Sequence, residues 1–203
     1  MSTDTQINSI ISAVRRINSL GLVGNGLSVR QKIAEASCLE VCVGASGDIS
    51  PDDIKTVSLD RPDGDDKELR AVCFAIFAKK PDAAAIISAS TPYLLNLSRI
   101  NAKIPPILDD FAQIIGINMK TADGASAVPA ALKGRNACML KDKGAIIVGR
   151  TLDEAVTALL VAEKTAKTYA LASALGKPAP ISTWEAALMN FVYKKKYSKI
   201  SKE

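Results

Sequence analysis

The sequence predicts an α/β fold of three layers, α/β/α, in which a central, mostly antiparallel sheet is flanked by helices. Hydrophobic residues make up 48% of the chain but aromatic residues only 4%, a composition that favours helices packed on a sheet. Segments with helical periodicity are separated by short apolar runs typical of strands, without strict alternation of strand and helix. Tight turns join several of these runs into hairpins, which only antiparallel strands form. We therefore expect one domain over residues 1–203.

The first half of the chain opens with an amphipathic helix over 5–20, which ends at Gly21. The turn Gly24-Asn25-Gly26 leads into a short strand, and a second strand follows after a polar stretch. The pattern places these strands at 27–30 and 39–43 and a third at 56–59. It then predicts a polar loop at 61–66, a helix at 68–80, and an apolar run at 83–87 that leads into residues 88–90, the end of a buried strand.

The second half begins with Thr91-Pro92, a helix start with proline in the first turn. Thr151 to Glu154 form a capping box that opens a long alanine-rich helix. The predicted elements here are helices at 91–100, 124–133 and 151–175, an extended connector at 104–106, a short helix and then a strand at 115–119, two strands at 137–140 and 145–148 joined by the turn 141–144, and a last helix capped by Ser182 that runs into a basic tail at 194–203.

Composition excludes several classes of protein. No stretch approaches the roughly 18 uninterrupted apolar residues of a membrane span, and the polar N-terminus lacks the apolar run of a signal peptide. We therefore expect a cytoplasmic location and no membrane span. The four cysteines are expected to be buried, reduced thiols, because a zinc site made of cysteines needs two closely spaced pairs; they are Cys38, Cys42, Cys73 and Cys138.

The net charge is +5, and five lysines stand in the tail at 194–203. Such a tail is typical of a solvated chain end, although a basic cluster also suits nucleic acid or another anionic surface. No nucleic-acid-binding motif is present, and aromatic residues that would stack on bases are few. We therefore expect no nucleic-acid partner.

The chain contains no histidine, so no imidazole can serve as a metal ligand or as an acid–base group. Several segments nevertheless resemble the class II aldolase/adducin family, which includes zinc-dependent fuculose-phosphate and rhamnulose-phosphate aldolases and ribulose-phosphate 4-epimerases. The resemblance extends from about Ile11 to about Ala166. It is carried by AVRRINSLGLVGNGLSVR, GASGDISPDDIKTVSLD, FAIFAKKPDAAAIISASTPYLLNLSR, IPP and NACMLKDKGAIIVGRTLDEAV, in that order. It implies the three-layer fold and assembly into rings, commonly tetramers, with active sites near subunit interfaces.

The resemblance also places the family's metal site on residues of a different kind. The His-x-His pair falls on Ser88 and Ser90, the third histidine on Lys143, and the acidic residue on Leu69, one position after Glu68. Serine hydroxyls are poor ligands for Zn²⁺, and a lysine ammonium repels it. We therefore expect no metal and no cofactor, although the family implies zinc.

An anion site is a second expectation from the resemblance. The family's phosphate-binding loop matches at Ser46 and Gly47, and its glycine-asparagine turn matches at Ser28, with Asn25 one position out of register. Backbone amides and hydroxyls of this kind hold phosphate or carboxylate without histidine. The alternative is that these residues form tight turns required only by the fold.

Two hypotheses for function follow. The first is a class II aldolase/adducin-like protein without zinc-dependent aldolase activity, which acts as a structural or binding subunit of a homo- or hetero-oligomer. The alternative is a lyase or epimerase for a sugar phosphate or small carbonyl compound, with metal-independent chemistry. In that case Lys143 is the candidate catalytic residue, because a lysine with a lowered pKa forms an imine with a carbonyl group.

Overall fold

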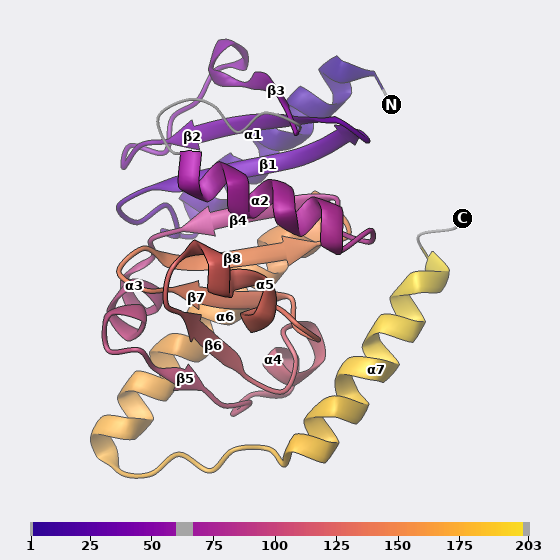
Figure 1. Cartoon of the computed structure of the whole chain (residues 1–203). Coiled ribbons are helices and arrows are strands. Elements are labelled where there is room, and N and C mark those ends of the chain that lie inside the picture. Colours follow the sequence, from indigo (N-terminus) through magenta and orange to yellow (C-terminus); the bar gives the residue numbers. More distant parts are fainter. Residues whose placement is uncertain (1, 60–66, 201–203) are drawn as a thin grey trace.

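A twisted eight-stranded sheet lies at the centre of the described part of the chain (Figure 1). The structure is a computed structural model that describes residues 2–59 and 67–200, and side chains through Lys196. Its strands lie in the order β3-β2-β1-β4-β8-β7-β6-β5, and every neighbouring pair is antiparallel except β6 and β7. The mostly antiparallel sheet between helices confirms the predicted α/β/α class.

The element bounds show which predictions hold. Strands are β1 Leu27–Ala34, β2 Ser37–Val43, β3 Lys55–Ser58, β4 Ala85–Ala89, β5 Lys103–Ile104, β6 Met119–Ala122, β7 Ala137–Leu140 and β8 Gly144–Gly149. Helices are α1 Thr3–Ser19, α2 Lys67–Lys79, α3 Pro92–Arg99, α4 Asp109–Ile114, α5 Val128–Ala131, α6 Leu152–Leu175 and α7 Thr183–Ile200, with single 3₁₀ turns at Pro51–Asp53 and Ala125–Ala127.

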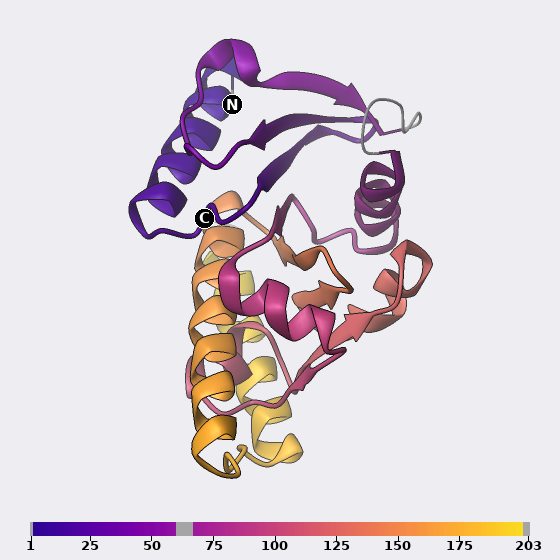
Figure 2. The ribbon, with the colours of Figure 1, turned by 90° about the vertical axis from the view of Figure 1, so that its left-hand side faces the viewer.

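Helices cover both faces of the sheet. Viewed along the sheet edge, α1 and α6 lie on one side and α2 and α5 on the other (Figure 2). Side chains on each strand alternate between the two faces, as the pleat requires. On β8, Ile147 joins the cluster with α1, α3, α4 and α6, whereas Ile146 and Val148 join the cluster with α2 and α5.

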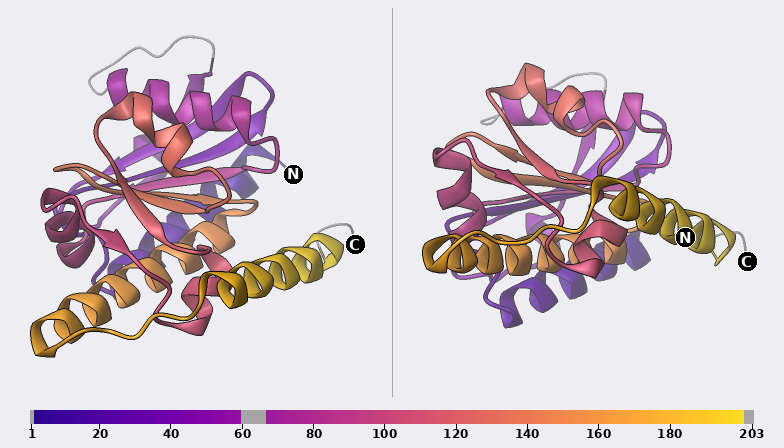
Figure 3. Two further views of the ribbon diagram at one scale, coloured as in Figure 1. Left: turned by 60° about the horizontal axis from the view of Figure 1, so that its bottom comes forward. Right: turned by 90° about the horizontal axis from the view of Figure 1, so that it is seen from below.

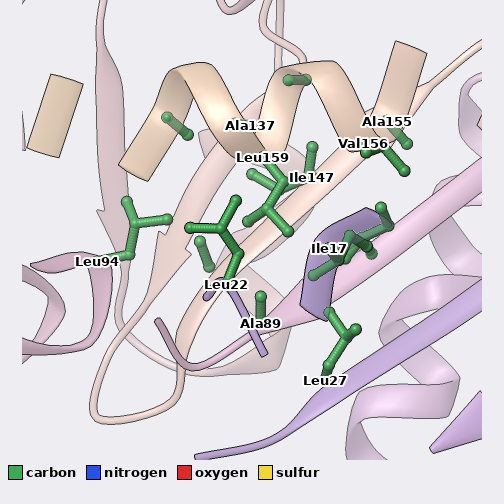
Figure 4. Packing of buried hydrophobic residues seen from close by; sticks show 14 of the residues in the cluster. Ile17, Leu22, Leu27, Ala89, Leu94, Ala137, Ile147, Ala155, Val156 and Leu159 are labelled. Carbon is green, nitrogen blue, oxygen red and sulfur yellow. The ribbon is translucent and has the colours of Figure 1, made fainter. Parts of the chain in front are cut away.

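The core on the α6 side is the larger cluster. Ile17 of α1, Leu27 of β1 and Ile147 of β8 converge there on Val156 and Leu159 of α6 (Figure 4). Small residues such as Ala89, Ala137 and Ala155 let the helix approach the strands closely. This packing fixes β4 and β8 side by side in the middle of the sheet, where both run into the candidate site.

Helix α7 lies outside the two main layers. It packs against α4, and Asn190 Nδ2 donates a hydrogen bond of 2.7 Å to the carbonyl oxygen of Gln113. The C-terminal end of α7 projects outward beyond the sheet and the other helices (Figure 3). Residues 194–200 of the basic tail continue this helix, and residues 201–203 lie outside the described part.

One predicted strand is wrong. The sequence pattern places it at 115–119, but strand β6 begins only at Met119. Gly116 has a φ of 120°, a left-handed conformation that turns the backbone away from α4 before the strand begins. The polar loop predicted at 61–66 lies outside the described residues.

Among the described helices, not one combines the length and the apolar character that crossing a bilayer requires.

Candidate functional site

The four positions that the resemblance assigns to the metal site converge on one hollow. Ser88 belongs to β4, Ser90 follows that strand, Lys143 precedes β8, and Leu69 lies in the first turns of α2. All four line a cavity of about 400 Å³ at this end of the sheet. The sequence reasoning therefore identified residues that are neighbours in space although they are up to 74 positions apart.

Close backbone contacts hold the two strand ends in place. A side chain on Gly144 would lie 2.2 Å from the carbonyl oxygen of Ala89, and one on Gly24 would lie 2.3 Å from that of Ser90. Both glycines have positive φ. Ser90 Oγ also donates a hydrogen bond of 2.9 Å to the carbonyl oxygen of Lys143. Only glycine fits at these two approaches.

A buried carboxylate fixes the chain just beyond Ser90. Glu163 of α6 accepts hydrogen bonds from Thr91 Oγ1 at 2.6 Å and from the backbone nitrogens of Tyr93 and Leu94 at 2.9 and 3.0 Å. It thereby satisfies amide groups in the first turn of α3 that have no partner within the helix. No local pattern in the sequence predicts this cap, because Glu163 is distant in the chain from the helix it stabilises.

Lys143 and Glu68 form the charged rim of the hollow. Lys143 Nζ lies 3.2 Å from Glu68 Oε2, and the Lys143 side chain is 49% exposed. The ion pair joins the turn between β7 and β8 to the start of α2. Leu69, one residue further along α2, is half-buried and packs against the α2-side core.

Hydroxyl and thiol groups stand in a row across the floor of the hollow. Ser28 on β1 pairs in register with Cys42 on β2 and with Ser88 on β4. Ser88 Oγ is buried without a well-formed hydrogen bond, although the Cys73 thiol on α2 lies close enough to interact with it. Burial raises the pKa of the Cys73 thiol, so that the group stays neutral.

Two buried charges lie directly behind this row. Arg30 is 1% exposed and Glu40 is 4% exposed, and their Nε and Oε2 atoms are 2.7 Å apart. Arg30 Nη1 also donates to Ser28 Oγ at 2.9 Å, and Arg70 Nη2 donates to Glu40 Oε1 at 2.5 Å. Burial alone would lower the pKa of Arg30, but Cys73 and Glu40 raise it above its usual value. The sequence signal that could have predicted this network is the single charged residue in each of the strands predicted at 27–30 and 39–43, Arg30 and Glu40.

The predicted anion-site residues are only partly brought together. Ser28 lines the hollow, and the backbone nitrogen of Asn25 beside it donates to the carbonyl oxygen of Ser90 at 3.2 Å. Ser46 and Gly47 lie in the loop after β2 and do not line it. Gly47 has a positive φ, and a side chain there would collide with that of Asn18, so the turn and its packing against α1 explain this glycine without a ligand.

The positions that correspond to the family's metal site do not suit zinc. Ser88 and Ser90 offer neutral hydroxyls, Lys143 a cation and Leu69 a hydrocarbon. Cys42 and Asp142 also line the hollow, but two such groups are fewer than the three or four protein ligands of a zinc site. Across residues 2–59 and 67–200 there is no group of three or more histidine, cysteine, aspartate or glutamate side chains placed to hold a metal ion. The site instead offers hydroxyl donors and the Lys143 ammonium around a concave floor, with the carboxylates of Asp142 in its lining and of Glu68 paired with Lys143. A small anion that binds there would displace Glu68 from the ammonium.

Comparison with known proteins identifies the family. Residues 8–170 match the Class II Aldolase and Adducin N-terminal domain. The chain is 27% identical over 177 residues to a 5-methylthioribulose-1-phosphate/5-deoxyribulose-1-phosphate aldolase of Rhodospirillum rubrum, covering 80% of this chain and 79% of that enzyme. It is 30% identical over 156 residues to the decarboxylase NovR of Streptomyces niveus, covering 66% of this chain and 57% of that protein's length.

The fold agrees with this assignment. An L-fuculose 1-phosphate aldolase superimposes with a TM-score of 0.83 at 22% identity, covering 96% of this chain and 98% of that one. At that identity the likeness concerns the fold alone. The match to the domain spans well over half of the sequence, and this chain belongs to the class II aldolase/adducin family.

Proposed function

We propose that this chain is a metal-independent member of its family, which binds a small anion in the hollow at Lys143 and serves as a binding or structural subunit of an oligomer. The observation that carries the proposal is the convergence of Ser88, Ser90 and Lys143 on one cavity. Zinc supplies positive charge to polarise a carbonyl in this chemistry. Here the Lys143 ammonium supplies the positive charge in a hollow that Ser88 and Ser90 also line.

Metal content tests the first half of the proposal. The purified protein, equilibrated with excess zinc chloride and then dialysed, is expected to hold well below one zinc per chain by elemental analysis. One tightly held zinc per chain that is lost in a Ser88→Ala variant would overturn the proposal. Cys42 lies in the same strand row as Ser88, so a Cys42→Ala variant separates adventitious thiol binding from the site itself.

Anion binding tests the second half. Ribulose 5-phosphate is expected to bind saturably in calorimetry, and Lys143→Met should weaken the binding by about tenfold or more, because a charge-assisted hydrogen bond is lost. Lys141→Met is the matched control, since Lys141 stands in the same turn but pairs with Asp123 at 3.2 Å and does not line the hollow. Equal effects of the two substitutions would contradict an anion site at Lys143.

The oligomer is supported by an apolar stripe on α7. Trp184, Leu188 and Val192 follow one another at helical spacing, and all three are exposed in the single chain. Such a stripe suits the matching face of a second copy. Native mass spectrometry is expected to show an oligomer that Leu188→Glu disrupts, whereas Ala187→Glu, on another side of the helix, leaves it intact. A monomeric wild-type chain would contradict this part of the proposal.

The second candidate is a lyase or epimerase that works through an imine at Lys143, and the names of the curated relatives, an aldolase and a decarboxylase, favour it. Lys143 does line the hollow, but its half-exposed ammonium is paired with Glu68 rather than buried in a dry pocket. Borohydride reduction in the presence of ribulose 5-phosphate distinguishes the candidates. A stable adduct on Lys143 would favour the enzyme, and its absence favours a binding protein.

A cytoplasmic location is part of the same proposal. Cys38, Cys73 and Cys138 are buried in the core as thiols, whereas Cys42, also predicted to be buried, is exposed at the hollow, and none of the four is in a disulfide. Reducing compartments keep such thiols in that state. Fractionation of cells that express the tagged protein would test the location directly.

A further inference from the structure

A second hollow lies at the opposite ends of the two central strands. Its volume is about 520 Å³, within the range of small-molecule sites. Ala83, just before β4, and Gly149, at the end of β8, line it, whereas the far ends of the same strands line the hollow at Lys143. Lys194 of α7 closes its outer side. It is therefore a separate site, and no residue of the first hollow belongs to it.

The walls of the second hollow are strongly basic. Asp82 is the carboxylate that lines it, against five cationic side chains: Lys79, Lys80, Arg150, Lys194 and Lys195. Of these, Arg150 is engaged by Glu154, to which its Nη2 and Nε atoms donate at 2.6 and 3.1 Å. Asp82 and Glu154 carry two negative charges, against three positive charges on Lys80, Arg150 and Lys194 alone. The hollow is a concave region of positive potential, which attracts anions.

The environment of two of these lysines, Lys80 and Lys194, disfavours their charged form. Lys80 Nζ donates a hydrogen bond of 2.5 Å to the carbonyl oxygen of Arg135, which is a neutral acceptor. The Lys194 ammonium is half-buried, and within the described residues it makes no hydrogen bond or salt bridge. Burial lowers the pKa of both. Lys194 lowers that of Lys80 further, and Arg150 lowers that of Lys194, against a weaker opposite effect of Asp82. Mutual repulsion of this kind is relieved by an anion placed between the cations.

We propose that the second hollow binds a small phosphate-bearing anion of two or more negative charges between Lys80 and Lys194. Lysine is a compact point charge that suits phosphate. Phe191, exposed on the rim, provides an apolar surface beside the basic floor. The proposal is independent of the function assigned to the first hollow, because it rests on other residues at the other end of the sheet.

Inorganic pyrophosphate is the probe, titrated by calorimetry into the full chain that carries Lys143→Met, so that the first hollow lacks its ammonium. Saturable binding is expected to persist in this background. Adding Lys194→Gln should weaken it by about tenfold or more, whereas Lys196→Gln should change it less than about threefold. Lys196 stands on the same helix but does not line the hollow, and it carries the same charge. Raising the salt concentration should weaken binding in all variants.

Three results would overturn the inference. One is the absence of saturable pyrophosphate binding to the folded protein up to about 10 mM, and another is an equal effect of Lys194→Gln and Lys196→Gln, which would indicate only a diffuse basic surface. The third is an equal affinity for sulfate and pyrophosphate at equal ionic strength, because a site that recognises phosphate by its charge should bind the more highly charged pyrophosphate more tightly. Circular dichroism of each variant confirms that α7 is still folded.

Discussion

The two faces of the central sheet carry different kinds of side chain, although helices cover both. On the α6 face, the strand residues that point into the core are apolar, and the cluster is continuous from α1 to α4. On the α2 face, the same strands place Ser28, Arg30, Glu40 and Ser88 beneath the helix. Because buried charges lose hydration energy even when they are paired, the α2 face gains less free energy from burial than the α6 face.

The two faces of the sheet therefore contribute differently to stability and to the candidate site. The α6 face, with its closely packed aliphatic residues, supplies most of the hydrophobic stabilisation. The α2 face supplies the polar groups of the hollow at Lys143 and the buried ion pair behind it. Stability and the candidate site are thus placed on opposite sides of the same strands, and each side can be tested by its own substitutions.

The largest expected effect is at Glu40. Glu40→Gln leaves the guanidinium of Arg30 buried without its carboxylate, and we expect the free energy of unfolding to fall by about 3–5 kcal/mol. Urea denaturation measures the change. Asp123→Asn, which breaks the exposed pair with Lys141, is the control and should cost at most about 0.5 kcal/mol. A loss below about 1 kcal/mol at Glu40 would mean that the α2 face is not held by this network.

The next effect concerns the thiols of the α2 face. Burial raises the pKa of Cys38 and of Cys138 from 9.0 to about 12 in the folded chain. The unfolded chain therefore loses these protons first, so that stability is full below pH 9 and falls as the pH rises towards 12. Between pH 8 and 10 we expect the two thiols to cost roughly 2–3 kcal/mol of unfolding free energy.

Denaturation at the two pH values tests this prediction against a chain with Cys38→Ala and Cys138→Ala. The double variant keeps every lysine and tyrosine, so their titration contributes equally to both proteins. Its stability should depend less steeply on pH than that of the wild type. Parallel pH profiles would show that the thiols are not buried as described.

A smaller effect is expected at the cap of α3. Glu163→Gln keeps an acceptor for Thr91 but removes the negative charge at the start of the helix, and we expect a loss of about 1–2 kcal/mol. Glu185→Gln, at the exposed cap with Ser182, should lower the free energy of unfolding by only about a few tenths of a kcal/mol. Faster hydrogen exchange at the Tyr93 and Leu94 amides would identify the cap as the cause, and unchanged exchange there would contradict it.

The smallest effects compare neighbouring residues on opposite faces. Ile146→Val and Ile147→Val each delete one buried methylene group, and each should cost about 1 kcal/mol. Similar values, from the same denaturation experiment, would show that the apolar part of the α2 face is packed as closely as the α6 face. A much smaller value for Ile146 would indicate that the polar groups beside it loosen the packing.

Much of the fold could be predicted from the sequence because it depends on local patterns. Thr151 caps α6 at the predicted place by accepting a hydrogen bond from the backbone nitrogen of Glu154, and the turn before Gly144 precedes β8 as predicted. The predicted capping box is only half formed, because the Glu154 carboxylate accepts from the backbone nitrogen of Arg150 instead of that of Thr151. The strand predicted at 115–119 was wrong because the apolar run contains Gly116, whose positive φ turns the backbone. The apolar pattern alone is the same whether or not the glycine makes this turn. Local apolar content does not reveal the backbone conformation at a single residue.

The candidate site was predictable only in part, for a related reason. The resemblance located Ser88, Ser90, Lys143 and Leu69, which the structure brings together. It could not reveal that Glu40 lies behind them or that Lys194 returns to the far end of the same strands, because these contacts join residues distant in the chain. Only the topology of the sheet places them.

The contacts of Gly24, Gly144 and Glu163 bear on how this scaffold can evolve. They set the positions of the strand ends through backbone atoms and a cap, and the side chains at Ser88 and Lys143 take little part in that framework. Mutations at these lining positions are therefore nearly neutral for folding. A lineage can exchange one chemistry for another there by single steps, each passing through a protein that still folds.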